Sequence, residues 1–141
     1  IKYFSSKNLK VGSIKHAHHN FDIDKKDTDS FLHRKAGAEE IIISSSKRWA
    51  KIDERTNLNE LCLENLLKKI ERADIVLVEG FKKENHKKIE VIREKNSKNE
   101  PLFNSLNNVI AIVSDKKQNT NLPIFDFNDF EKIGEFILSI D

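Results

Sequence analysis

Two continuous apolar runs, each closed by an acid, constrain the fold more than any other feature of this sequence. Residues 74–80 read Asp-Ile-Val-Leu-Val-Glu-Gly, and residues 109–115 read Val-Ile-Ala-Ile-Val-Ser-Asp. A strand needs apolar side chains on both faces when helices cover both sides of its sheet, which is typical of parallel sheets. The two runs therefore predict buried parallel strands in an α/β fold.

Strand and helix patterns alternate along the rest of the chain. We expect strands over residues 10–16, 40–45, 48–53 and 89–93, and helices over residues 28–36, 57–72 and 130–140. Asp27, Asn57 and Asn128 stand where helix N-caps are expected, and Gly37 stands where a helix-ending glycine belongs. This alternation indicates a mostly parallel sheet flanked by helices, which binds ligands beyond the carboxyl ends of its strands.

Length and composition favour one globular domain over residues 1–141. The chain is 38% hydrophobic and 34% charged, and its formal net charge of +2 gives no reason to expect a nucleic-acid partner. Cys62 is the only cysteine, so no disulfide framework exists and a cytoplasmic location fits best. No apolar run approaches the roughly 20 residues that span a bilayer, so no membrane partner is expected. The lysine-rich stretch 82–88 is either a solvated face or a phosphate-handling loop.

Imidazoles and carboxylates are concentrated just after the first expected strand. The members of this group are His16, His18, His19, Asp22 and Asp24. One interpretation is a metal centre of a hydrolase or a metal carrier that uses His16, His18, His19 and Asp24. A second interpretation is contact with an anionic ligand, aided by Lys15, and a third gives these side chains a structural role only.

Acids at strand ends and before a helix suggest magnesium and phosphate chemistry. Glu79 closes a buried strand, where an acid can hold Mg²⁺ through water or orient an attacking water, and Gly80 lets a phosphate approach the backbone. Asp29 and Ser30 offer hard oxygen ligands near a helix start. Asp115 ends the other buried strand, where a carboxylate can accept paired N–H donors from a guanine edge.

The sequence contains no glycine-rich phosphate loop of the Walker type and no nucleophile elbow around a serine. Residues 1–8 read like the last turns of a helix, and Asn8 suits a left-handed residue after that helix. A domain that opens partway through a helix is expected to lack its beginning.

Several motifs together resemble the MobB family, molybdopterin-guanine dinucleotide biosynthesis protein B. They are Ile14-Lys15-His16-Ala17-His18-His19-Asn20-Phe21-Asp22-Ile23-Asp24, Asp29-Ser30, Arg34-Lys35-Ala36-Gly37-Ala38, Arg48-Trp49 and Leu77-Val78-Glu79-Gly80-Phe81-Lys82. The resemblance implies a P-loop NTPase fold whose first strand and P-loop are missing from this chain. It also implies GTP binding, at most feeble GTPase activity and a homodimer.

The same resemblance implies a biological setting and roles for particular residues. The setting is attachment of GMP to molybdopterin, in which this protein assists the nucleotidyltransferase MobA. Asp29 and Glu79 would lie near Mg²⁺, with Glu79 as the catalytic candidate. The residues facing nucleotide or the pterin phosphate would be Lys15, His16, His18, Ser30 and Gly80, with Asp115 as a guanine contact. Besides the GTP-binding protein and the metal centre, a third interpretation is a structural adaptor whose surface around Trp49 and Phe81 recruits partners.

Overall fold

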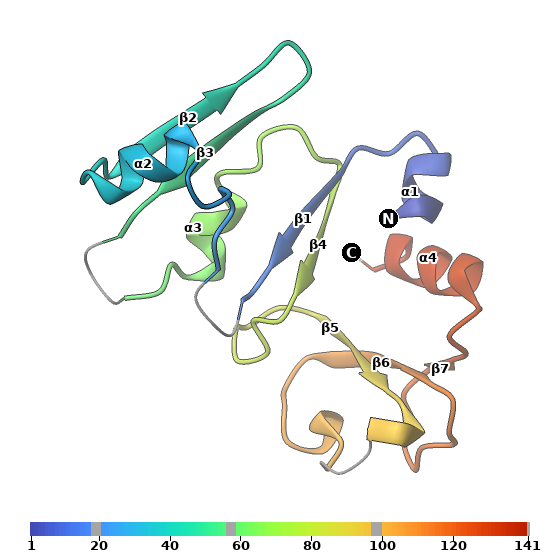
Figure 1. Cartoon of the computed structure of the whole chain (residues 1–141). Helices are drawn as coiled ribbons and strands as arrows, with labels where there is room; N and C mark the ends of the chain where they lie inside the picture. Colours follow the sequence, from blue (N-terminus) through green and yellow to red (C-terminus); the bar gives the residue numbers. More distant parts are fainter. Residues whose placement is uncertain (18–20, 56–58, 97–99, 141) are drawn as a thin grey trace. The chain divides into compact units, whose positions relative to one another are not determined.

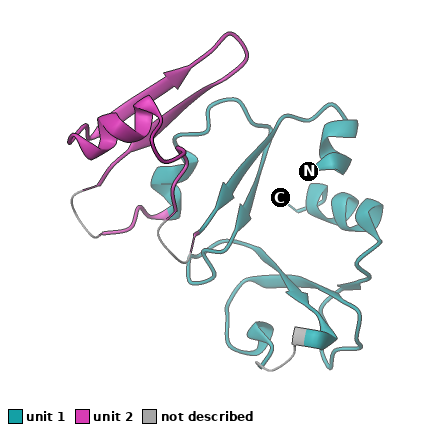
Figure 2. Cartoon of the chain, viewed as in Figure 1, with its two compact units in different colours: residues 1–16, 63–141 teal, residues 17–62 magenta. Residues whose placement is uncertain are grey.

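The computed structural model describes residues 1–17, 21–55, 59–96 and 100–140. It divides into two compact units, which are described separately (Figure 2). Unit 1 contains residues 1–16 and 63–141, and unit 2 contains residues 17–62. The single domain favoured by the chain length stays a prediction. Among the described residues, no helix is both long and apolar enough to cross a membrane.

The first sheet of unit 1 pairs two strands that lie far apart in the sequence. β1 (Val11–Lys15) and β4 (Ile75–Glu79) run parallel, with Val11 opposite Ile75 and Lys15 opposite Glu79 (Figure 1). Both strands were predicted from their apolar patterns, and each is one residue shorter at both ends than expected. The parallel register brings the carboxyl ends of the two strands together.

The second sheet of unit 1 is also parallel and holds the most buried strand. Its order is β5 (Lys88–Ile92), β6 (Val109–Ser114) and β7 (Ile124–Phe125). Ala111 and Ile112 in the central strand β6 are 0% exposed, which confirms that this apolar run is buried. The short strand β7 was not predicted from the sequence.

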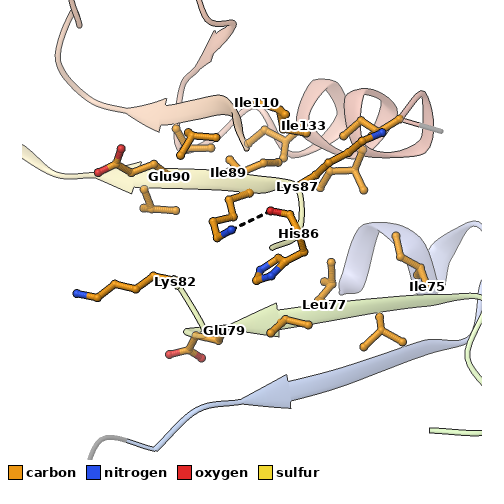
Figure 3. A pocket seen from close by; sticks show the side chains of 18 of the residues that line it. Ile75, Leu77, Glu79, Lys82, His86, Lys87, Ile89, Glu90, Ile110 and Ile133 are labelled. Atoms are coloured by element: carbon orange, nitrogen blue, oxygen red, sulfur yellow. Dashed lines mark hydrogen bonds between the residues drawn. The ribbon is translucent and has the colours of Figure 1, made fainter. Parts of the chain in front are cut away.

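An apolar cavity of about 990 Å³ lies in unit 1 between β4 and the second sheet (Figure 3). Its walls come from β4, β5, β6 and α4 (Phe130–Leu138). In the described sheets β4 pairs with β1, and β5 pairs with β6, so each is an edge strand. α1 (Lys2–Ser6) contacts α4 and buries Phe4, and Asn8 follows α1 in the predicted left-handed conformation, with φ 61°.

Unit 2 consists of one helix and a hairpin. α2 (Asp29–Lys35) contacts β2 (Glu40–Ser44), which pairs antiparallel with β3 (Trp49–Asp53). Ile41 lies opposite Ile52 and is buried, and Ser45 N–H donates to the Arg48 carbonyl at 2.9 Å across the turn. The two strands and their connecting turn confirm the predicted return of residues 48–53 beside residues 40–45.

The prediction of a long helix over residues 57–72 was wrong. The helix present is α3 (Leu63–Leu67), and the expected cap Asn57 lies outside the described residues. Helical stability comes mostly from packing an apolar face, and within α3 only Leu63 is buried. Ile70 lies beyond the helix and packs against Gly12 of β1.

Two predicted N-caps were each wrong by one residue. Asp27 has φ 68°, whereas an N-cap is normally extended, and Thr28 takes the cap position of α2 with φ −85° and ψ 161°. Asp129, not Asn128, precedes α4. Gly37 follows α2 with φ 103°, as predicted for a helix-ending glycine. Two short 3₁₀ helices, η1 (Glu94–Asn96) and η2 (Leu102–Asn104), complete unit 1.

Candidate functional site

The carboxyl ends of β1 and β4 present an ion pair. Lys15 and Glu79 face each other in the parallel register, and Lys15 Nζ donates to Glu79 Oε1. Their side chains are 69% and 72% exposed, so the pair is reached by solvent and by any ligand. Figure 3 shows Glu79 at the end of β4. The parallel pairing therefore brings together the predicted phosphate-facing lysine and the predicted magnesium-binding acid.

A tight turn follows Glu79 and holds His16 in place. Gly80 and Phe81 both have positive φ, at 93° and 49°. The His16 N–H donates to the Glu79 carbonyl at 2.8 Å, and the His16 ring stacks on Phe81 with a centroid distance of 4.7 Å and an interplanar angle of 29°. A Cβ placed on Gly80 would lie 2.6 Å from His16 Cβ. Gly80 therefore has a structural role, beside the predicted approach of a phosphate.

Asp115 lies beyond the carboxyl end of β6 and already has a partner. Its Oδ1 accepts the backbone N–H of Glu94 at 2.9 Å, at the start of η1. The buried Ser114 before it accepts the Lys116 N–H and a Gln118 side-chain N–H, each at 3.1 Å. These contacts order the turn after β6, and a guanine contact of Asp115 stays a prediction.

Arg34 organises the acids of unit 2. Its Nη2 donates to Asp24 Oδ1 at 2.8 Å and to Asp22 Oδ1 at 2.9 Å, and its Nε donates to Asp24 Oδ2 at 3.3 Å. Asp24 is 1% exposed at its side chain, and the hydrogen bond that Arg34 donates to the Asp24 carboxylate raises the pKa of Arg34 above its ordinary value. Glu54 lies 3.4 Å from Arg34 Nε. The network ties the segment before α2 to the helix.

The candidate ligands Asp29 and Ser30 lie at the start of α2 in unit 2. Asp29 is exposed, and Ser30 Oγ lies 3.3 Å from Thr28 Oγ1. Asp29 and Glu79 belong to different units, so a magnesium site that uses both residues stays a prediction.

The metal-centre interpretation finds no support in the part of the chain that is described. No group of three His, Cys, Asp or Glu side chains there could hold a metal ion. His18 and His19, two of the four nominated ligands, lie outside the described residues. His16 stacks on Phe81, and the Asp24 carboxylate is held by Arg34 through both oxygens.

The two residues of the predicted recruiting surface, Trp49 and Phe81, differ in exposure, and recruitment of a partner there stays a prediction. Trp49 is 70% exposed, so it is not packed in the core. Phe81 is 8% exposed, because its ring is covered and stacks on His16. The two residues also belong to different units.

Two residues received no role from the sequence. Arg34 was part of a quoted motif, and the alternating acids Asp22 and Asp24 were the available signal for its network. His86 lies in the loop between β4 and β5, and its buried Nδ1 has no hydrogen-bond partner among the described residues. Burial lowers the pKa of His86, and the ammonium of Lys88 lowers it further. No sequence signal separated His86 from its lysine neighbours.

Parallel strands with flanking helices and charged groups at the strand ends define an α/β protein. Solved structures with this fold are similar to the chain. A crystal structure of molybdopterin-guanine biosynthesis protein B (mobB) gives a TM-score of 0.75 at 22% identity, covering 98% of this chain and 85% of that one. The crystal structure of Bacillus subtilis MobB gives a TM-score of 0.71 at 24% identity, covering 99% of this chain and 85% of that one.

Sequence comparison gives the family. The family model for molybdopterin guanine dinucleotide synthesis protein B matches residues 1–115. The molybdopterin-guanine dinucleotide biosynthesis adapter protein of Escherichia coli (strain K12) is 36% identical over 135 residues, which are 94% of this chain and 77% of that protein. The protein of the same name from Haemophilus influenzae (strain ATCC 51907 / DSM 11121 / KW20 / Rd) is 31% identical over 134 residues, which are 94% of this chain and 73% of that protein. The chain belongs to the MobB family.

Proposed function

We propose that this protein is a cytoplasmic, GTP-binding adapter in molybdopterin guanine dinucleotide biosynthesis that assists the nucleotidyltransferase MobA. Family membership supports the setting, since two relatives are named as adapter proteins of that biosynthesis. The observation that carries the ligand assignment is the Lys15–Glu79 pair at the carboxyl ends of β1 and β4. Ligands of open parallel sheets bind at that end.

The chemistry of the pair suits a magnesium-bound nucleotide. A lysine ammonium binds phosphate as a point charge, and Mg²⁺ prefers carboxylate and phosphate oxygens. The cation and the anion that neutralise each other in the free protein have matching partners in a magnesium–triphosphate complex. Lys15 would then face a phosphate oxygen, and Glu79 would hold Mg²⁺ directly or through water. Asp29 is the proposed second magnesium ligand, and His16, His18, Ser30, Gly80 and Asp115 are proposed ligand contacts.

Weak or absent GTP hydrolysis is part of this proposal. Glu79 is the candidate for orienting an attacking water, but the sequence offers no Walker-type loop whose backbone N–H groups would surround the phosphates. Side chains alone are poor substitutes for such a nest of N–H groups. Binding, not turnover, is therefore the property to measure.

The test is a titration with GTP, in the presence and absence of Mg²⁺. Glu79→Ala should weaken magnesium-dependent binding about tenfold, which corresponds to about 1.4 kcal/mol. Lys15→Ala should weaken binding in both conditions. Glu135→Ala on the exposed side of α4 is the control for loss of one acid. Unchanged affinity in both site variants would remove the assignment.

The proposed partners need separate assays. A homodimer is proposed, and Ile42 and Trp49, which are 67% and 70% exposed in the hairpin of unit 2, form an apolar surface that an interface would cover. Light scattering should give twice the chain mass, and Trp49→Glu should shift the protein toward monomer. Capture of purified MobA, with and without GTP, tests the adapter role directly.

A further inference from the structure

A second, smaller cavity of unit 1 is polar. It has a volume of about 450 Å³ and lies between the loop after β4 and the loop before β6. Its polar walls are formed mainly by Lys82, Lys83, Asn85, Lys88, Ser105 and Asn107. A volume of this size falls in the range of small-molecule sites. Among the described residues, none of those nominated for GTP or Mg²⁺ lines it.

Lys88 gives this cavity a fixed positive charge. The side chain is part-buried, and its Nζ donates to the backbone carbonyls of Glu84 at 2.5 Å and His86 at 2.9 Å. The dashed line in Figure 3 marks the bond to His86. Within the described part of the chain, no carboxylate pairs with this ammonium. The two carbonyl dipoles hold the ammonium in position but do not neutralise its charge. Since a lysine ammonium has three N–H donors, the third donor of Lys88 remains for a ligand.

The remaining charges add to that of Lys88. Lys82 and Lys83 extend exposed side chains from the same loop, and neither has an ion-pair partner among the residues described. Of the described residues in the cavity wall, Glu84 alone is an acid, so three ammonium groups face one carboxylate. Excess positive charge in a partly enclosed polar site attracts anions more strongly than the same charges do when spread over a surface.

Neutral donors complete the lining. Asn85 Oδ1 accepts a hydrogen bond from Asn108 Nδ2, which orients the Asn85 amide and leaves its NH₂ group able to donate elsewhere. Asn107 and the Ser105 hydroxyl come from the opposite loop. Amide and hydroxyl donors beside ammonium groups suit an anion with several acceptor oxygens, and a phosphate group has them.

We propose that this cavity binds the phosphate group of a phosphorylated small molecule, with Lys88 fixed at its base and Lys82 and Lys83 closing on the phosphate oxygens. The cavity is lined by other residues than the described ones proposed to contact Mg²⁺ or the nucleotide, and phosphate binding there needs no magnesium. Two sources share this chemistry, namely a phosphate of the nucleotide itself and the phosphate of a second ligand.

The test uses inorganic phosphate as the probe and the whole chain labelled with ¹⁵N. At constant ionic strength, phosphate should shift the side-chain amide signals of Asn85 and Asn107. Lys82→Ala/Lys83→Ala should weaken the phosphate affinity about tenfold. Lys116→Ala/Lys117→Ala removes the same charge from another exposed lysine pair and should change the affinity less than twofold. Equal weakening in both double variants, or shifts scattered over many surface lysines, would overturn the proposal.

Two further experiments use Lys88 variants and the addition of GTP. Lys88→Arg should keep phosphate binding, and Lys88→Met should abolish it. If Lys88→Met does not fold, the Lys82→Ala/Lys83→Ala variant still tests the proposal. Loss of the phosphate-induced shifts when GTP is added assigns the site to the nucleotide, and shifts that persist assign it to a second phosphorylated ligand. Failure of GTP to bind would count against the proposed function and would leave the phosphate readout intact. Absence of any shift with phosphate would refute the site.

Discussion

Gly80 offers the sharpest test of the geometry at the end of β4. Its φ of 93° lies in a region that L-residues rarely adopt, and a Cβ there would lie 2.6 Å from His16 Cβ. Gly80→Ala therefore adds two penalties, one from the backbone and one from overlap with His16. Gly37 provides a matched control, because it has φ 103° and a Cβ there would meet nothing within 4 Å.

The two glycines allow the penalties to be separated. A left-handed conformation costs an L-residue about 1–2 kcal/mol, so Gly37→Ala should lower the free energy of unfolding by about that amount. Forcing extra volume into a packed site costs about 1–3 kcal/mol more, so Gly80→Ala should lose roughly 2–5 kcal/mol. Denaturant unfolding measures both variants, and an unchanged m-value shows that the comparison concerns stability.

Removal of His16 Cβ decides whether the overlap is the cause. His16→Gly in the Gly80→Ala background should recover the steric part of the loss. His16→Ala keeps the offending Cβ and should not recover it. Equal destabilisation by Gly80→Ala and Gly37→Ala, or equal rescue by His16→Gly and His16→Ala, would refute the close approach of His16 to the β4 turn.

Two further predictions concern the loops around β5. Burial lowers the pKa of His86 below its ordinary value of 6.5, so the neutral ring is favoured in the folded state. The stability that the neutral His86 ring contributes is complete above pH 6.5 and is lost as the pH falls through the lower folded-state pKa. His86→Gln should therefore flatten the fall in the free energy of unfolding between pH 7.5 and 5. An unchanged slope would contradict the lowered pKa of His86. Glu90 accepts the N–H groups of Leu102 at 2.7 Å and Phe103 at 2.8 Å. Glu90→Ala should cost about 1–3 kcal/mol in thermal or denaturant unfolding, and Glu90→Gln, which keeps one acceptor oxygen, should cost less.

The two strands with continuous apolar runs were predictable, but only β6 contains buried residues, and β4 is half-buried rather than buried as predicted. The aliphatic run of β6 is continuous, since both faces of that strand are covered, and Ile112 is fully buried as a result. Strand ends were uncertain by one residue, because backbone pairing stops where the partner strand stops. The hairpin of unit 2 was predictable from two short apolar runs that flank a polar turn.

Helix ends depend on tertiary packing and on backbone angles that a residue name does not fix. The run of leucines after residue 57 has helical spacing, yet only Leu63 of α3 finds a buried position, so the helix is short. Asp27 is a good capping residue by type, but its φ of 68° removes it from the cap position. Thr28 takes that position with extended angles.

In the candidate site, too, some contacts could be predicted from the sequence and others could not. Lys15 and Glu79 become neighbours once the two strands are parallel and in register, so their pairing follows from the fold. The stacking of His16 on Phe81 requires two consecutive residues with positive φ, and no spacing rule predicts that Phe81 adopts one. The Arg34 network joins residues ten and twelve positions apart through a loop, and the alternating acids Asp22 and Asp24 were a signal that did not identify Arg34 as their partner.

The Arg34 network narrows the choice of magnesium ligand in unit 2. The Asp24 side chain is almost fully buried and accepts hydrogen bonds from Arg34 at both oxygens, so moving its carboxylate to a metal ion would leave a guanidinium without its main partner. Breaking such a buried pair is far more costly than using a solvated acid. Asp29 is exposed at the start of α2, and within the described ranges of the chain it has no such ion-pair partner to give up. Asp29 is therefore the acid near α2 from which a ligand for Mg²⁺ is expected, and Asp24 is expected to hold the segment that precedes it.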